Sequence, residues 1–157
     1  MQRTTGSSVC IAVIFILFST TAAAGIDADS PEASPWFNML GADINRVEAV
    51  FGKTYVEIPP AQLESRADRI IWYAPGLTLW FSDGALVQLR VDSGADGEII
   101  GLKAGMSEAG VKRICGAPWI ESAGSLYYNL PWQGGPVRLR FVFNSSGLDE
   151  IYLYYVR

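Results

Sequence analysis

Arginine and tyrosine side chains recur at every second position in two stretches near the end of this 157-residue sequence. Arg138 and Arg140 stand in one stretch, Tyr152 and Tyr154 stand in the other, and mostly apolar residues fill the positions between them. Side chains of a β-strand alternate between the two faces of a sheet, so each stretch predicts one apolar face and one face of guanidinium and phenol groups. These groups bind partners through ion pairs, hydrogen bonds and stacking. The pattern therefore indicates binding chemistry.

Residues for bond-breaking chemistry are scarce by comparison. The chain contains no histidine, and it has neither the nucleophile elbow of hydrolases nor a phosphate-binding glycine loop. Asp149 and Glu150 are adjacent, so on a strand their carboxylates point to opposite faces and do not form an acid–base pair. We therefore expect a protein that is not an enzyme and that uses no cofactor.

The acidic loop 92–98 and Cys115 are the remaining candidates for site chemistry. The carboxylates of the loop could hold Ca²⁺, but their order does not match an EF-hand; the alternative, which we favour, is a solvated loop and no metal site. Cys115 precedes Gly116 at an expected helix end, and we expect it to be a buried, unreactive thiol. It is the one cysteine after residue 24, so the mature chain would have no internal disulfide.

The first 24 residues have the pattern of a secretory signal peptide. Arg3 supplies a positive start, the run 9–18 is apolar, and Ala22-Ala23-Ala24 suits signal cleavage. We expect a periplasmic or secreted protein with no transmembrane segment after cleavage; a retained anchor is the alternative. Residues 25–35 are acidic and contain proline, which predicts a mobile linker. The net charge of −4, with dispersed Lys and Arg, argues against a nucleic-acid partner.

Hairpins and capped helices are the elements that would position the binding groups. We expect strands at 69–73, 77–81, 85–91 and 125–128, with a tight turn at Asp83-Gly84 and a second hairpin over 136–155. Short helices are expected at 43–52 and 107–116, each starting at a capping residue and ending at glycine.

The same order of elements occurs twice. Asp43 and Ser107 cap the two helices, Gly52 and Gly116 end them, and each pair is 64 positions apart. This indicates an α+β fold made of a tandem repeat, over 36–92 and 99–157. In each repeat a short helix would precede a three-stranded antiparallel sheet and pack on one face of it. Chance similarity of two helix-then-hairpin segments is the alternative.

If helices cover the apolar face, the opposite face is open. Strand alternation predicts that it carries the partner-binding residues Trp72, Trp80, Arg90, Tyr127, Arg138, Arg140, Tyr152 and Tyr154. Trp, Tyr and Arg are the residue types enriched at interface hot spots. The alternative is that the rings cover a loop or the linker 25–35, or that they only stabilise the sheet through cross-strand pairs.

The second unit also resembles a known family. Gly101, Gly105-Met106-Ser107, Cys115-Gly116 and Pro118, followed by a Tyr-rich strand and a Phe-x-Phe hairpin, are similar to the motif of the BamE/SmpA small outer-membrane lipoproteins. The doubled arrangement resembles the fold of the β-lactamase inhibitor protein. The resemblance implies short helices packed on a sheet whose concave face grips a partner. A lipobox and the paired cysteines of the inhibitor are both missing from this chain.

These observations predict an exported protein-binding module of the cell envelope. Its partner would be another envelope or extracellular protein, and its oligomeric state is open. The sequence leaves two alternatives: an inhibitor of a secreted hydrolase such as a β-lactamase, and a small-ligand-binding domain.

Overall fold

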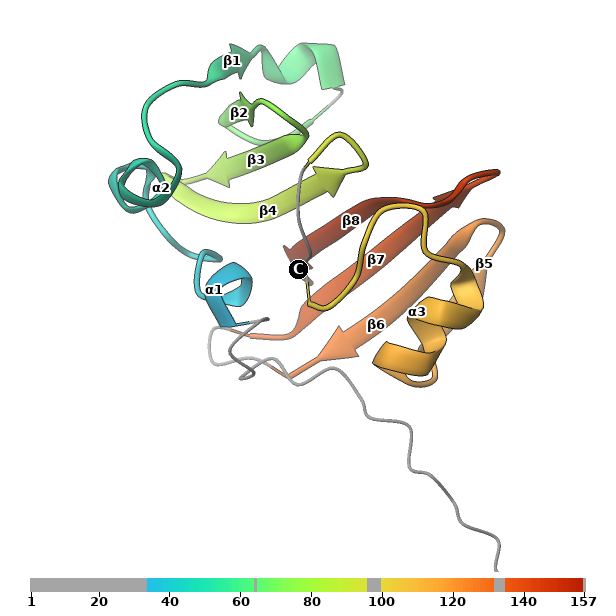
Figure 1. The fold of residues 1–157 in the computed structure, drawn as a ribbon. Helices are drawn as coiled ribbons and strands as arrows, with labels where there is room; N and C mark the ends of the chain where they lie inside the picture. Colours follow the sequence, from blue (N-terminus) through green and yellow to red (C-terminus); the bar gives the residue numbers. More distant parts are fainter. Residues whose placement is uncertain (1–33, 64, 96–99, 132–134, 157) are drawn as a thin grey trace, which may run out of the picture.

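Eight strands form one antiparallel sheet in the computed structural model, which describes residues 34–63, 65–95, 100–131 and 135–156 (Figure 1). In sequence order the strands are β1 (Val56–Ile58), β2 (Arg69–Tyr73), β3 (Leu77–Ser82), β4 (Ala85–Asp92), β5 (Ile120–Ser122), β6 (Ser125–Leu130), β7 (Val137–Asn144) and β8 (Gly147–Tyr155). Their spatial order is β1-β2-β3-β4-β8-β7-β6-β5. The helices are α1 (Ser34–Phe37), α2 (Ile44–Phe51), α3 (Glu108–Cys115) and the 3-10 turn η1 (Pro60–Leu63).

The predicted fold class, a tandem repeat of helices on three-stranded sheets, is wrong. β4 pairs with β8 from Gln88↔Tyr154 to Asp92↔Glu150, so the strands of both halves belong to one sheet. The helices are few and short, and the fold is dominated by the sheet. The physical reason is that the edge of a sheet presents unpaired N–H and C=O groups, and here the two inner edges satisfy each other. The predicted signal peptide and residues 25–33 of the linker lie outside the described residues, while Ser34 and Pro35 begin α1.

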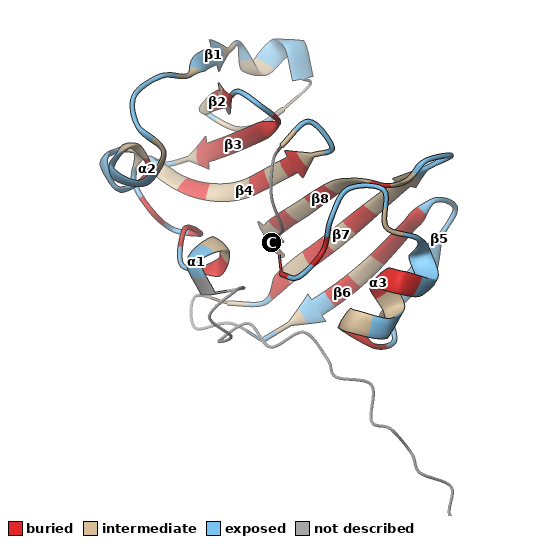
Figure 2. Ribbon diagram, viewed as in Figure 1, coloured by how far each residue is buried: buried red, intermediate tan, exposed pale blue. Residues whose placement is uncertain are grey.

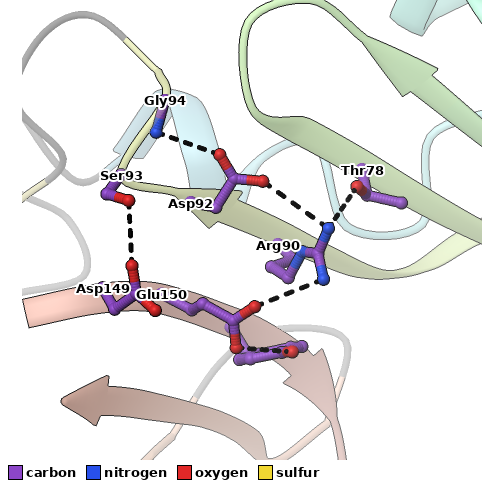
Figure 3. Close-up of polar contacts among 8 residues, drawn as sticks. Thr78, Arg90, Asp92, Ser93, Gly94, Asp149 and Glu150 are labelled. Carbon is purple, nitrogen blue, oxygen red and sulfur yellow. Dashed lines mark hydrogen bonds and ion pairs between the residues drawn. The ribbon is translucent and has the colours of Figure 1, made fainter. Parts of the chain in front are cut away.

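Two side-chain contacts reinforce the junction of β4 and β8. The hydroxyl of Ser93 donates a hydrogen bond to Oδ1 of Asp149 at 2.8 Å, and Nη1 of Arg90 lies 3.3 Å from Oε1 of Glu150 (Figure 3). Both contacts link residues about 60 positions apart in the sequence. The junction is therefore fixed by side chains as well as by the backbone ladder.

Both longer helices begin and end at the expected residues. Oδ1 of Asp43 accepts a hydrogen bond from the N–H of Arg46 at 2.9 Å, and Oγ of Ser107 accepts one from the N–H of Gly110 at 3.2 Å. These bonds satisfy amide groups that a helix start leaves free. Each helix ends at a glycine with positive φ, 84° at Gly52 in one and 80° at the equivalent residue of the other.

Two tyrosines hold the ends of these helices against the sheet. The hydroxyl of Tyr73 donates to the carbonyl of Gly52 at 2.8 Å, and that of Tyr128 donates to the carbonyl of Gly116 at 3.0 Å. Carbonyl groups at a helix end have no partner within the helix, so each tyrosine satisfies one. The same bond thus recurs in both halves of the sheet.

The apolar core lies between one face of the sheet and the helices. Leu79, Leu89, Leu139 and Leu153 are fully buried on neighbouring strands and cluster with residues of α2 and α3. Buried and half-buried residues alternate along β4, β7 and β8, as Figure 2 shows. In Figure 1, α3 and the chain leading into it pass in front of β6, β7 and β8. The opposite face of the sheet, called the outer face below, points away from this core.

Within the described ranges, no helix is long and apolar enough to cross a membrane.

Candidate functional site

All eight residues predicted from strand alternation lie on the outer face. Register places them in two adjacent rows. One row crosses the sheet as Trp72, Thr78, Arg90, Tyr152, Arg140 and Tyr127. The next crosses it as Ile70, Trp80, Gln88, Tyr154, Arg138 and Asn129. Residues directly opposite one another share a face, so strands far apart in the sequence bring these side chains together.

Guanidinium groups and aromatic rings alternate along these rows. The guanidinium carbon of Arg140 lies 5.7 Å from the ring centre of Tyr127 and 5.5 Å from that of Tyr152. The guanidinium carbon of Arg90 lies 6.0 Å from the ring centre of Trp80. Cations within about 6 Å of a ring centre are attracted by its π face. The rings therefore hold these arginine side chains in place across the sheet.

Arg90 is neutralised by its neighbours. Its Nη2 atom lies 3.2 Å from Oγ1 of Thr78 and 3.5 Å from Oδ2 of Asp92, and its Nη1 atom faces Glu150 (Figure 3). The hydroxyl of Tyr152 donates to the same Glu150 carboxylate at 2.9 Å. The charge of Arg90 is thus compensated by carboxylates of the protein itself. The Arg90 side chain links β3, β4 and β8.

Arg138 and Arg140 differ from Arg90 because neither has a carboxylate partner among the described residues. Nε of Arg138 donates to Oδ1 of Asn129 at 2.9 Å, and its guanidinium carbon lies 4.8 Å from the ring centre of Trp119. Nε of Arg140 is buried and has no hydrogen-bond partner among the described residues. Within the described ranges, no anion therefore compensates these two half-buried cations of the outer face.

An open hollow of about 570 Å³ occupies the outer face beside Arg90. Its floor includes Trp80 and Gln88, Tyr152 and Tyr154 form one side, and Leu63 and Arg66 from the connector before β2 form the other. The connector narrows the open surface, so Trp80 is only 8% exposed. The expectation that the whole face is open is therefore wrong at this end: Trp80 lines a recess instead of projecting into solvent.

Three residues of the outer surface were missing from the predicted set. Trp119 is 57% exposed and contacts Arg138, and Ile120 beside it is 41% exposed on edge strand β5. Arg66 is exposed at the rim of the hollow. Trp119 precedes β5 and Ile120 begins it, and this strand is too short to show alternation; Arg66 is in a connector, so no periodic signal marked the three residues.

The Tyr152 phenol and the Cys115 thiol both have a raised pKa and so stay protonated. Burial raises the pKa of the Tyr152 phenol above its ordinary value, and the neighbouring Glu150 carboxylate raises it further, against the opposing effect of Arg90. Tyr152 therefore remains a protonated donor at neutral pH. Burial raises the pKa of the Cys115 thiol to about 12, which leaves it protonated and unreactive in the core.

The described residues contain no group of three or more histidine, cysteine or acidic side chains placed to hold a metal ion. In the described part of the acidic loop 92–98, Asp92 is engaged by Arg90 and by the N–H of Gly94, while residues 96–98 lie outside the described ranges. The outer face instead carries aromatic rings, hydrogen-bond donors and arginine side chains, which are suited to binding a ligand.

Comparison of this chain with protein-family models, with curated proteins and with solved structures finds no significant match. The resemblance to the BamE/SmpA family and to the fold of the β-lactamase inhibitor protein therefore stays a prediction.

Proposed function

We propose that this chain is exported and binds a protein partner through its outer face, without catalysing a reaction. The observation that carries the proposal is Arg140, a cation that is held between two tyrosine rings and has no carboxylate partner among the described residues. Arginine and aromatic anchors at the centre of a patch are typical of interface hot spots.

The surroundings of Arg140 support the same function. Arg138 and the exposed Trp119 lie in contact beside it, so cations and rings extend to the β5 edge of the sheet. The chain as a whole carries a net charge of −4, so this positive region stands out against the charge of the rest. A partner with carboxylates at the matching positions would be oriented by it, with an association rate that falls as salt is added.

The proposed location is the periplasm or the extracellular space, and it rests on the signal-like residues 1–24. Fractionation of the source cells, followed by determination of the N-terminal residue of the mature protein, tests it. A mature chain that starts close to residue 25 and is found outside the cytoplasm is the expected result. A cytoplasmic chain that keeps residues 1–24 would contradict it.

The binding proposal is tested with surface variants of matched chemistry. Proteins retained by the immobilised wild type are identified, and the purified partner is then titrated calorimetrically with each variant. We expect Arg140→Ala and Arg138→Ala each to weaken binding about tenfold, which corresponds to about 1.4 kcal/mol. Arg113→Ala removes an exposed arginine of α3 and should leave the affinity unchanged.

Circular dichroism would establish that the three variants keep the wild-type fold. If Arg113→Ala weakens binding as much as Arg140→Ala does, or if neither substitution changes the affinity, the outer face is not the binding surface.

A further inference from the structure

The hollow on the outer face is larger than a gap between side chains. Its volume of about 570 Å³ lies within the roughly 300–1,000 Å³ that is usual for small-molecule sites. Its walls come from three separate parts of the chain: the connector that carries Leu63 and Arg66, the β3–β4 hairpin, and β8. Such a recess is built by the fold and does not depend on a single loop.

Several aromatic side chains line the hollow. Trp80 is almost fully buried at the floor, and Tyr152 and Tyr154 flank it from β8. Trp80 is directly opposite Gln88, and Gln88 is directly opposite Tyr154, so these three side chains stand in one row across β3, β4 and β8. A planar ring is the ligand group that such walls contact best, because stacking and edge contacts both use flat surfaces.

Polar groups without a protein partner converge on the same space. Among the described residues, none donates to or accepts from the side chains of Gln88 and Tyr154, and Arg66 has no carboxylate partner. Arg90 also lines the hollow, but Asp92 and Glu150 already compensate its charge. The carboxylate of Asp68, in the connector, is turned to the β3–β4 turn, where it accepts from the N–H of Asp83. Among the residues that the structure describes, the uncompensated charge at the hollow is therefore that of Arg66.

We infer that the hollow is a binding site for a small planar aromatic anion. The ring would lie against Trp80 and the two tyrosines, and the anionic group would pair with Arg66 and accept hydrogen bonds from Gln88 or Tyr154. This inference does not depend on the proposed protein partner, because it concerns the lining of the hollow and not the cations of β7. Carboxylate and phosphate ligands share the required chemistry.

The test is a titration of small-molecule probes into the mature chain. Binding is monitored through the NMR signal of the Trp80 indole N–H, which is assigned with a Trp80→Phe variant. The first probe is 2-naphthoate, which combines a ring with a carboxylate. 2-Naphthalenemethanol has the same ring without charge, cyclohexanecarboxylate has the charge without a planar ring, and 2-naphthyl phosphate distinguishes a phosphate from a carboxylate ligand.

The expected result is a saturable shift of the Trp80 signal by 2-naphthoate, with an affinity at least tenfold higher than for either the neutral or the non-planar probe. Arg66→Gln should lower the affinity for 2-naphthoate to that for 2-naphthalenemethanol. Arg113→Gln, an exposed arginine on the far side, should have no effect. Tighter binding of 2-naphthyl phosphate would support the site and assign it to phosphate monoesters.

The inference is overturned if no probe shifts the Trp80 signal saturably at millimolar concentration. It is equally overturned if the neutral probe binds as well as the anion, or if Arg66→Gln changes nothing. Because these experiments contain no protein partner, their failure leaves the proposed protein-binding function standing, and loss of that function leaves this site standing.

Discussion

The guanidinium carbon of Arg140 lies 5.5 Å from the ring centre of Tyr152, its direct neighbour across the β7–β8 ladder. Tyr127 contacts the same guanidinium from the other side, and no described residue forms a hydrogen bond with the buried Nε of Arg140. Ring contacts of this kind are worth about 0.5–1 kcal/mol each at exposed sites. In the part of the chain that the structure describes, rings and no carboxylate hold Arg140 in position, so its charge is available to a ligand.

The ion pair of Arg90 and Glu150 should contribute measurably to stability. The two side chains are only 27% and 25% exposed and join the two halves of the sheet. In a double-mutant cycle of alanine substitutions, followed by urea unfolding, we expect a coupling free energy of about 1 kcal/mol. Lys53 and Glu48 form the matched control, since the lysine is 82% exposed and solvent screens the pair. Equal coupling in both pairs would contradict this role for Arg90.

Gly147 should be far less replaceable than Gly84. Both have positive φ, but a Cβ atom at Gly147 would clash with the backbone of Gly105, whereas one at Gly84 would meet open space. We expect Gly147→Ala to lower the free energy of unfolding by about 3 kcal/mol or more, and Gly84→Ala by about 1 kcal/mol. Chemical denaturation of the two variants measures the difference, and similar losses would refute the close approach of the backbone at Gly147 to that at Gly105.

The two tyrosines that bind helix ends should respond alike to loss of the hydroxyl. Tyr73→Phe and Tyr128→Phe each leave a glycine carbonyl unsatisfied, so we expect each to lower the free energy of unfolding by about 1 kcal/mol. Tyr154→Phe is the control, because its hydroxyl has no hydrogen-bond partner among the described residues. Thermal unfolding measures all three, and a loss for Tyr154→Phe as large as the others would argue against the assigned bonds.

Cys115 should make stability depend on alkaline pH. Burial raises the pKa of its thiol from an ordinary value near 9 to about 12. Between these values the unfolded chain loses a proton that the folded chain retains, so stability is fully present below about pH 9 and falls as the pH rises. Tyr128, whose pKa burial also raises to about 12, adds to the fall above pH 10.

Urea unfolding from pH 8 to 10.5 measures this dependence. For a single thiol the slope approaches about 1.4 kcal/mol per pH unit. Cys115→Ala removes this contribution, so the variant should lose less stability than the wild type over the same range. An identical slope in both proteins would mean that the thiol is not buried in the folded state.

Local signals in the sequence predicted the elements whose causes are local. The Asp83-Gly84 turn, the strands beside it and the caps of α2 and α3 agree with the structure, because a few neighbouring residues decide each of them. β1 and β5 were missed, since each has three residues with no fully buried position and so shows no apolar alternation. The pairing of β4 with β8 was also missed, because no local pattern records which edges meet.

For the candidate site, the sequence predicted which face of the sheet each residue occupies, but not which other segments contact that face. Alternation alone put all eight predicted residues on one face, because side-chain direction repeats every two residues. It gave no information on what covers that face. The connector over Trp80 and the carboxylates around Arg90 come from distant parts of the sequence. Only the fold therefore reveals which arginines are paired with carboxylates and which are available to a partner.

The central place of β8 in the sheet has a consequence for biogenesis. Ribosomes synthesise a polypeptide from its N-terminus, yet residues 147–155 fill the gap between β4 and β7. Until they emerge, β4 has an unpaired border with exposed amide groups, which is a starting point for self-association. A nascent chain interrupted before residue 147 would therefore be prone to self-association, and chaperones that cover the β4 edge would be needed most until β8 is complete.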